Sequence, residues 1–169
     1  DAVEKLCCEC LLARLPADAS LNANAFRREH CYCEATDLAL RAREPSLRAL
    51  FGVYAALGAS GTEDLGARSI LLESQLMTAG AWLSLLRDVG LVEMGLISLR
   101  MGLHAFQWCR IRSLTDYSER AEALLRHMTF CDFCEALVRL ATVAALPTRE
   151  EMEEGGAPSA AEFLHALRR

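Results

Sequence analysis

One group of cysteine and histidine residues has a spacing that could bind a metal ion. Cys7 and Cys10 lie three residues apart, as do His30 and Cys33, in two stretches that we expect to form consecutive helices. If these helices face each other, the four side chains provide the ligand types of a tetrahedral zinc site. Zinc ligands usually sit on tight turns rather than in mid-helix, and cysteine commonly packs as a small buried residue. We therefore favour packing over zinc binding here.

Cys131 and Cys134 form a second group, a Cys-x-x-Cys motif at the expected start of a helix. The helix dipole and free backbone amides at such a position lower the pKa of a thiol, and the spacing is formally that of redox-active cysteines. A thioredoxin-like enzyme also requires a βαβ sheet, and the chain has almost no strand signal. We therefore expect a protein that is not an enzyme. A zinc-binding or redox protein built on either cysteine group is the first alternative.

The histidines do not indicate a catalytic site. His30, His104, His127 and His165 are scattered, and none has the serine or carboxylate neighbours of a triad. We expect His104 to be a hydrogen-bonded residue of the core. Because no glycine-rich loop follows a strand, nucleotide binding is not indicated, and we expect no cofactor.

Composition indicates a folded globular chain. Of its 169 residues, 53% are apolar and 24% are charged, and only 4 are proline. The net charge of −5 disfavours binding to nucleic acid or to an anionic membrane. There is no signal peptide, and no apolar run approaches the roughly 20 residues that span a bilayer. We expect a soluble cytoplasmic protein, and the start at Asp1 indicates a processed chain or part of a longer one.

Helical periodicity dominates the N-terminal part of the chain. Apolar residues recur at helical spacing over residues 1–15, and a second helix is expected over about residues 21–43. These two helices would form an N-terminal helical hairpin, residues 1–44. Pro45 is expected to break the run and to begin a third helix with Phe51 facing inward.

Two later segments resemble each other. Residues 77–92 (MTAGAWLSLLRDVGLV) and 128–141 (MTFCDFCEALVRLA) both begin with Met-Thr and continue as amphipathic helices. We expect the short extended pieces at Met77 and Met128 to pair with each other, because each alone leaves its backbone groups unpaired. The residues that we expect in the core of the chain are Phe51, Trp82, Leu86, Phe106, Trp108, Phe133 and Leu137.

Other segments surround this pair. Residues 58–75 contain turn-forming small residues and predict a long loop with irregular turns. Residues 99–112 predict a central helix that is apolar on nearly all sides, capped by Ser98. Residues 114–126 predict a helix capped by Thr115.

Neither unit offers the ligands that calcium requires. If Met128 occupies the eighth position of a calcium-binding loop, then positions one, three and five fall on Ala121, Ala123 and Leu125. None of these residues has a side-chain oxygen. The first unit is similarly poor in ligands, so calcium binding by the usual geometry is not expected.

These segments resemble known helical modules. The segments 77–92 and 128–141, with AFQWCRIRS around Phe106, resemble the EF-hand-like domain of the tubulin polymerization-promoting protein family. They resemble more closely the modules of ciliary and flagellar axoneme-associated proteins. The resemblance covers roughly residues 47–148 and implies a microtubule or axonemal setting. The long insert before Met77 and the helix at 114–126 depart from a compact EF-hand pair.

The expected fold is all-α. A degenerate, calcium-free paired EF-hand-like core over residues 45–148 follows the N-terminal hairpin and precedes an acidic linker and tail helix, residues 149–169. We expect the tail helix and the 58–75 loop to contact partners. The tail residues assigned to this contact are Phe163, Leu164 and Leu167.

The expected function is that of a non-catalytic structural or adaptor module of a ciliary or flagellar, microtubule-associated protein. Its partners would be other proteins, namely microtubule or axonemal components of the cytoskeleton. The negative net charge disfavours simple electrostatic adhesion to the acidic surface of tubulin. The second alternative is a calcium-independent regulatory protein that binds an amphipathic helix in a groove and is unrelated to microtubules.

Overall fold

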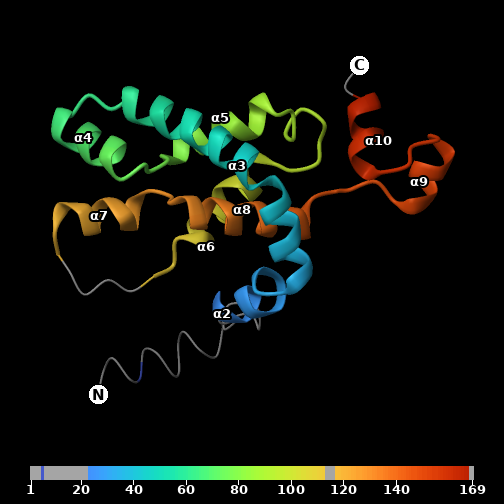
Figure 1. Cartoon of the computed structure of the whole chain (residues 1–169), viewed down its shortest axis with the longest axis horizontal. Coiled ribbons are helices and arrows are strands. Elements are labelled where there is room, and N and C mark those ends of the chain that lie inside the picture. The colour runs from blue at the N-terminus through green and yellow to red at the C-terminus, as the bar shows by residue number, and fades with distance from the viewer. Residues whose placement is uncertain (1–4, 6–22, 113–116, 168–169) are drawn as a thin grey trace.

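The computed structural model describes residues 5, 23–112 and 117–167, which are mostly helical and include no β-strand (Figure 1). The all-α prediction is therefore confirmed. The larger helices are α3 (Glu34–Ser60), α4 (Leu65–Glu73), α5 (Ala79–Asp88), α6 (Leu99–Cys109), α7 (Glu119–Arg126) and α8 (Phe130–Val143). They are preceded by α2 (Ala23–Phe26) and the π-helical turn η4 (Arg27–Cys31), and followed by α9 (Arg149–Glu154) and α10 (Ala160–Leu167). In these described parts, no helix combines the length and apolar character needed to cross a membrane.

α3 continues through Pro45, so the expected helix break at this residue is wrong. Proline lacks an amide hydrogen and crowds the preceding turn, which bends a helix. Figure 1 shows that α3 changes direction along its length. One exposed ion pair precedes the proline, from Arg41 Nε to Asp37 Oδ2 at 2.8 Å, and another spans it, from Arg48 Nε to Glu44 Oε1 at 2.7 Å. At about 0.2–0.5 kcal/mol each, they offset only part of the roughly 3 kcal/mol that an interior proline costs. The helix is therefore bent rather than ended, and it crosses the expected boundary at residue 44.

The helix expected over residues 21–43 is instead interrupted at its middle. Tyr32 and Cys33 separate η4 from α3, and Cys33 has an extended backbone, with φ −96° and ψ 150°. The Thr36 hydroxyl donates a hydrogen bond to the carbonyl oxygen of His30 at 2.7 Å. Such a side-chain bond offers the backbone a partner outside the helical ladder, which favours the interruption. The other half of the expected hairpin, residues 1–15, lies outside the described residues apart from Lys5.

The segment 58–75 is not a long loop, because it contains α4. Asp64 Oδ1 begins this helix by accepting hydrogen bonds from the amides of Gly66 and Ala67, at 2.8 and 3.3 Å. Only Leu71 of the helix is fully buried, against Ala59 and other residues of a small second core. One buried residue leaves no apolar stripe for a sequence pattern to detect.

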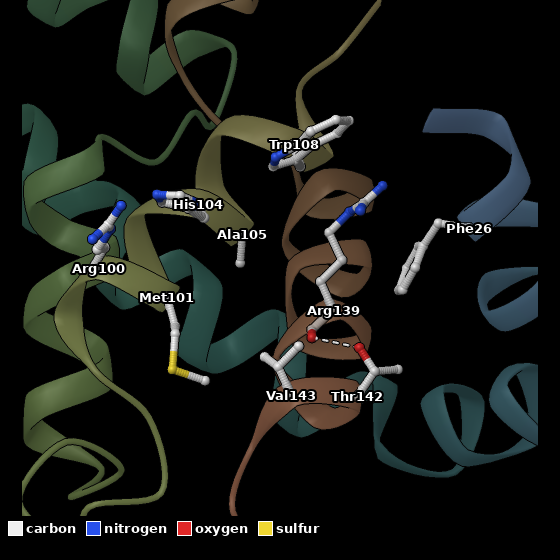
Figure 2. A pocket seen from close by; sticks show the side chains of 9 residues that line it. All are labelled: Phe26, Arg100, Met101, His104, Ala105, Trp108, Arg139, Thr142 and Val143. Carbon is white, nitrogen blue, oxygen red and sulfur yellow. Dashed lines mark hydrogen bonds between the residues drawn. The ribbon is translucent and has the colours of Figure 1, made fainter. Parts of the chain in front are cut away.

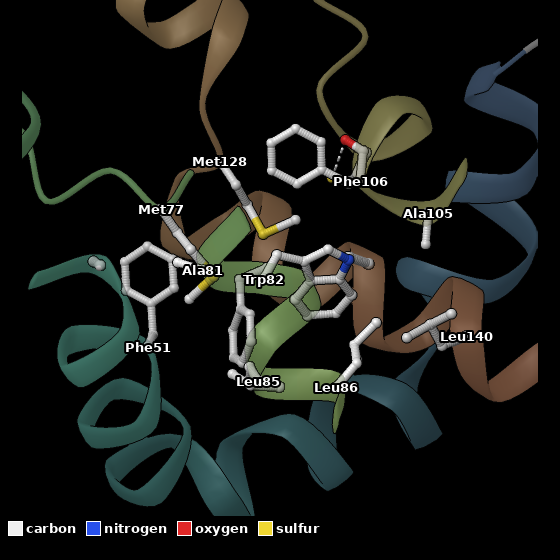
Figure 3. Packing of buried hydrophobic residues seen from close by; sticks show 14 of the residues in the cluster. Phe51, Met77, Ala81, Trp82, Leu85, Leu86, Ala105, Phe106, Met128 and Leu140 are labelled. Carbon is white, nitrogen blue, oxygen red and sulfur yellow. Dashed lines mark hydrogen bonds between the residues drawn. The ribbon is translucent and has the colours of Figure 1, made fainter. Parts of the chain in front are cut away.

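The two similar units pair at the expected residues. Met77 and Met128 form an antiparallel β-bridge in which each amide donates to the carbonyl oxygen of the other residue at 2.9 Å. Both side chains are fully buried, and Figure 3 shows them beside Trp82 in the core. The expectation that the two short extended pieces pair is confirmed. Thr78 and Thr129, the next residues, then cap α5 and α8.

An aromatic cluster fills the space between these helices. The rings of Trp82 and Phe133 meet edge to face with centroids 5.9 Å apart, and Phe51 lies 5.4 Å from Phe133. The indole Nε1 of Trp82 donates to the carbonyl oxygen of Gly102 at 2.9 Å, so its polar atom is satisfied inside the core. The expected core residues that are buried are Phe51, Trp82, Leu86, Phe106 and Phe133.

The other two expected core residues, Leu137 and Trp108, are not fully buried. Leu137 is partly buried and packs against the core. Trp108 is 40% exposed, so its assignment to the core is wrong. α6 packs on both α5 and α8, and the face that carries Phe106 and Cys109 points inward. A helix that is apolar on nearly all sides does not reveal from sequence which of its stripes is buried.

The tail forms two short helices rather than one. Thr148 and Glu151 form a capping box that begins α9 within the expected acidic linker. α10 turns back on α9, since a Cβ atom added to Gly155 would lie 2.8 Å from the ring of Phe163. Figure 1 shows α9 and α10 to one side of α8, joined to it by an extended segment. Phe163 and Leu164 are half-buried, and the side chain of Leu167 lies outside the description.

The close approach of α3 to α5 predicts opposite effects for two glycines of α3. A Cβ atom at Gly58 would lie 2.7 Å from Thr78 Oγ1 and 3.0 Å from Ala81 Cβ. Gly58→Ala should lower the free energy of unfolding by roughly 1–3 kcal/mol through overpacking. Gly52 of the same helix has no described atom within 4 Å of an added Cβ, so Gly52→Ala should raise it by about 0.5–1 kcal/mol.

Urea unfolding followed by circular dichroism measures both variants. The opposite signs are the test, because intrinsic helix propensity alone favours alanine at both positions. Stabilisation by both substitutions would contradict the contact between α3 and α5.

Candidate functional site

An open groove of about 620 Å³ lies between α2, α6 and α8 (Figure 2). Trp108 and Val143, on opposite helices, remain 40% and 54% exposed, so apolar surface is available to a ligand. We call it the α6–α8 groove. Its lining residues are Phe26, Arg100, Met101, His104, Ala105, Trp108, Arg139, Thr142 and Val143.

α6 presents one continuous side to the groove. Met101, Ala105 and Trp108 follow one another at spacings of four and three, and therefore share a face of the helix. Ser98 Oγ begins the helix by accepting from the Met101 amide at 3.2 Å, as expected for its cap. His104 is exposed and lines the groove, so the expectation that it is a core residue is wrong.

Arg139 of α8 is fixed in place by three neighbours. Its Nε and Nη2 donate to Glu135 Oε1 at 2.9 and 2.7 Å. Its guanidinium carbon lies 4.1 Å from the ring centroid of Phe26 and 5.8 Å from that of Trp108. Figure 2 shows Arg139 extending between these two aromatic side chains. Among the described residues, its Nη1 group has no hydrogen-bond acceptor.

Arg27 holds α2 and η4 against the other two helices. Its Nε donates to Glu135 Oε2 at 2.8 Å, and its Nη2 donates to the carbonyl oxygens of Cys109 and Ile111 at 3.2 and 3.1 Å. These carbonyls lie at and beyond the end of α6, where a cation is favourable. Burial opposes the charge of Arg27, but the hydrogen bond and the negative charge of Glu135, together with Tyr32 and Asp132, outweigh it and raise the pKa of the guanidinium. Glu135 thus bridges two arginines and leaves one positive charge in excess.

Asp132 is a buried carboxylate at the start of α8, only 8% exposed. Its Oδ2 accepts from the Thr129 amide at 2.8 Å and from the Thr129 hydroxyl at 2.7 Å, and it also accepts a hydrogen bond from Arg112. The residue therefore caps the helix and pairs with a cation. Sequence reasoning missed this role, although Thr-x-x-Asp before an apolar run is a capping-box pattern.

The first cysteine group receives no support as a zinc site. Cys7 and Cys10 lie outside the described residues. The Cys33 sulfur lies 3.1 Å from Thr36 Oγ1, and hydrogen bonding by the Thr36 side chain and backbone, which favours the thiolate, lowers the pKa of Cys33. Nowhere in residues 23–112 and 117–167 do three or more histidine, cysteine or acidic side chains group together as a metal site. The zinc hypothesis for the complete set of four residues stays a prediction.

The second cysteine group differs from the expected redox motif. Cys131 is exposed, and Cys134 is half-buried. Burial raises the pKa of the Cys134 thiol to about 11, helped by its neighbour Cys131. The expected lowering of the thiol pKa is therefore wrong for Cys134, because loss of hydration outweighs the helix dipole. A thiol with this pKa is protonated at neutral pH and is a poor nucleophile.

No family model matches this chain, and neither the curated proteins nor the solved structures contain a significantly similar match. The candidate site therefore stands on its geometry. Sequence reasoning placed Trp108 in the core and did not identify the groove. The spacing of Arg100, His104 and Trp108 along one face of a helix is the signal that could have indicated it.

The difference between the two cysteines of the motif can be measured. At mildly alkaline pH, iodoacetamide should modify Cys131 well before Cys134, because Cys134 is shielded and its thiol stays protonated. The rate at Cys134 should rise as the pH approaches its pKa of about 11. Trypsin releases both cysteines in one peptide, residues 127–139, and fragmentation of that peptide in tandem mass spectrometry assigns the label to each site. Equal rates at mildly alkaline pH would contradict the burial of Cys134.

Proposed function

We propose that this chain is a non-catalytic adaptor module that binds other proteins in a ciliary or flagellar, microtubule-associated setting. The observation that carries the proposal is the pairing of two helix–linker–helix units through Met77 and Met128. In each unit, α4–α5 and α7–α8, a short extended piece joins two helices, and α4 packs on α7. This arrangement supports the resemblance to degenerate EF-hand-like modules of axonemal and tubulin-associated proteins.

The proposed EF-hand-like pair is built for packing rather than for calcium. α7 extends to Arg126, so the positions that would hold ligands, at Ala121, Ala123 and Leu125, lie inside a helix. Only His127–Thr129 separate α7 from α8, which leaves no loop to surround an ion. The extended pieces serve to join the two units into one core.

The groove favours an adaptor over a redox protein. Its exposed Trp108 and its oriented Arg139 belong to the residue types that dominate protein–protein binding energy. By contrast, Cys134 has a raised pKa, the opposite of what thiol chemistry requires. The groove also supports the second alternative, a regulatory binder of an amphipathic helix.

The microtubule or axonemal setting rests on the sequence resemblance of residues 77–92 and 128–141. Binding should be demonstrable by co-sedimentation of the full chain with purified microtubules and with salt-stripped axonemes. We expect the chain to pellet with at least one of these polymers and to stay in the supernatant without polymer. If it pellets with neither at low or physiological ionic strength, the setting is wrong and the regulatory alternative is favoured.

Calcium should have no effect on the isolated chain. The proposed module lacks ligand oxygens at the calcium positions, so millimolar calcium should leave the melting temperature equal to that measured in a chelator. Isothermal titration with calcium should show only heats of dilution. A saturable heat, or a rise in melting temperature reversed by chelator, would contradict the calcium-free interpretation.

A further inference from the structure

We propose that the α6–α8 groove binds an acidic amphipathic helix of a partner protein. The apolar face of that helix would pack on Met101, Trp108 and Val143, and its carboxylates would face Arg100 and Arg139. This inference rests on the proposed adaptor function, and it names the binding site and the chemistry of the partner.

The shape of the groove suits a helix. α6 and α8 pack against each other, and the hollow between two packed helices accepts the side-chain ridge of a third. Met101 and Trp108 supply apolar surface from one helix, with Ala105 buried between them, and Val143 supplies it from the other (Figure 2). Leu146, just beyond the end of α8, is 51% exposed and adds further apolar surface at that end of the helix.

The charge around the groove selects for an acidic ligand. Its charged lining residues are Arg100 and Arg139, with His104 beside them, and its lining contains no carboxylate. α6 itself contains no acidic residue. Glu135 next to the groove is already shared between Arg27 and Arg139. The groove is therefore locally positive in a chain of net charge −5, which attracts acidic partners and repels basic ones.

The acidic tail of the chain does not neutralise this groove. α9 contains Glu150, Glu151, Glu153 and Glu154, but no residue of α9 or α10 lines the groove. Figure 1 shows both helices to one side of α8. Among the described residues, no acidic side chain of the tail pairs with the groove, where Arg100 is exposed and Arg139, 13% exposed, presents the edge of its guanidinium that Glu135 does not bind.

Arg139 is already oriented before a ligand arrives. Glu135 holds one edge of its guanidinium, and Phe26 covers one face at 4.1 Å. A side chain that is fixed in advance loses little conformational entropy on binding, and arginine forms directional bonds to carboxylates. Arg100 is exposed and adds a second cation on the opposite helix.

Two synthetic helical peptides with the same leucine stripe test the proposal, one flanked by glutamates and the other by lysines. Titration into the full chain is followed by anisotropy of a labelled peptide and by tryptophan fluorescence, in which Trp108 is exposed and Trp82 is buried. We expect the glutamate peptide to bind at least about tenfold more tightly at low salt, with the difference shrinking as salt rises. Equal binding of the two peptides, or no binding of either, would overturn the proposal.

Substitutions locate the binding site. Arg100→Glu and Val143→Glu should each weaken the glutamate peptide by about tenfold, because the first reverses a groove charge and the second places a carboxylate in the apolar strip. The matched controls are Arg87→Glu on α5 and Val53→Glu on α3, which are exposed and do not line the groove. Arg100→Glu should also improve binding of the lysine peptide. Equal losses in groove and control variants would contradict the location.

All four substituted residues are exposed, so each variant should be about as stable as the native chain. Urea unfolding of each variant checks this. The peptide experiment is independent of the co-sedimentation experiment. If the chain pellets with axonemes but binds neither peptide, the groove proposal fails and the adaptor proposal stands. If the glutamate peptide binds and the chain does not pellet, the groove proposal stands and the axonemal setting fails.

Discussion

Two backbone hydrogen bonds between Met77 and Met128 fix the relative position of the two helical units. Both residues are fully buried, so an unpaired amide or carbonyl there would cost free energy that no water could recover. The bridge also sets the starting points of α5 and α8, because the following residues, Thr78 and Thr129, cap these helices. Trp82 and Phe133, at equivalent positions of the two helices, then meet edge to face at 5.9 Å.

The position of α8 determines where a ligand can bind. One face of the helix carries Phe133 and Leu140 into the core, and another carries Glu135 and Arg139 toward α2 and α6. Because the core fixes α8 along its length, the ionic face is held rigidly as well. The groove is therefore a consequence of the same packing that joins the two units, and the Arg27–Glu135 ion pair holds η4, next to the groove residue Phe26, against α8.

Sequence patterns predicted the features that depend on local periodicity. The Met-Thr openings and the amphipathic stripes located α5 and α8 and the pairing of their first residues. Features that depend on tertiary context were not predictable in this way. Pro45 obeys a local rule for ending helices, but α3 continues through it, and beyond the proline the helix buries Phe51, Ala55 and Ala59 against other elements. α4 buries only Leu71 and so leaves no stripe, and α6 is apolar on so many sides that the exposure of Trp108 could not be inferred. The groove forms because the core covers the side of α6 that carries Phe106 and Cys109 and leaves the side that carries Met101 and Trp108 uncovered.

The joining of two units through one buried bridge is tested most directly by native-state hydrogen exchange of the amides of Met77 and Met128. If the bridge joins the units into one core, these two amides should exchange only when the whole molecule unfolds, with the same free energy of opening as Trp82. Exchange of either amide as fast as that of the linker residue Glu63 would contradict the account, because the two units would then open independently of each other.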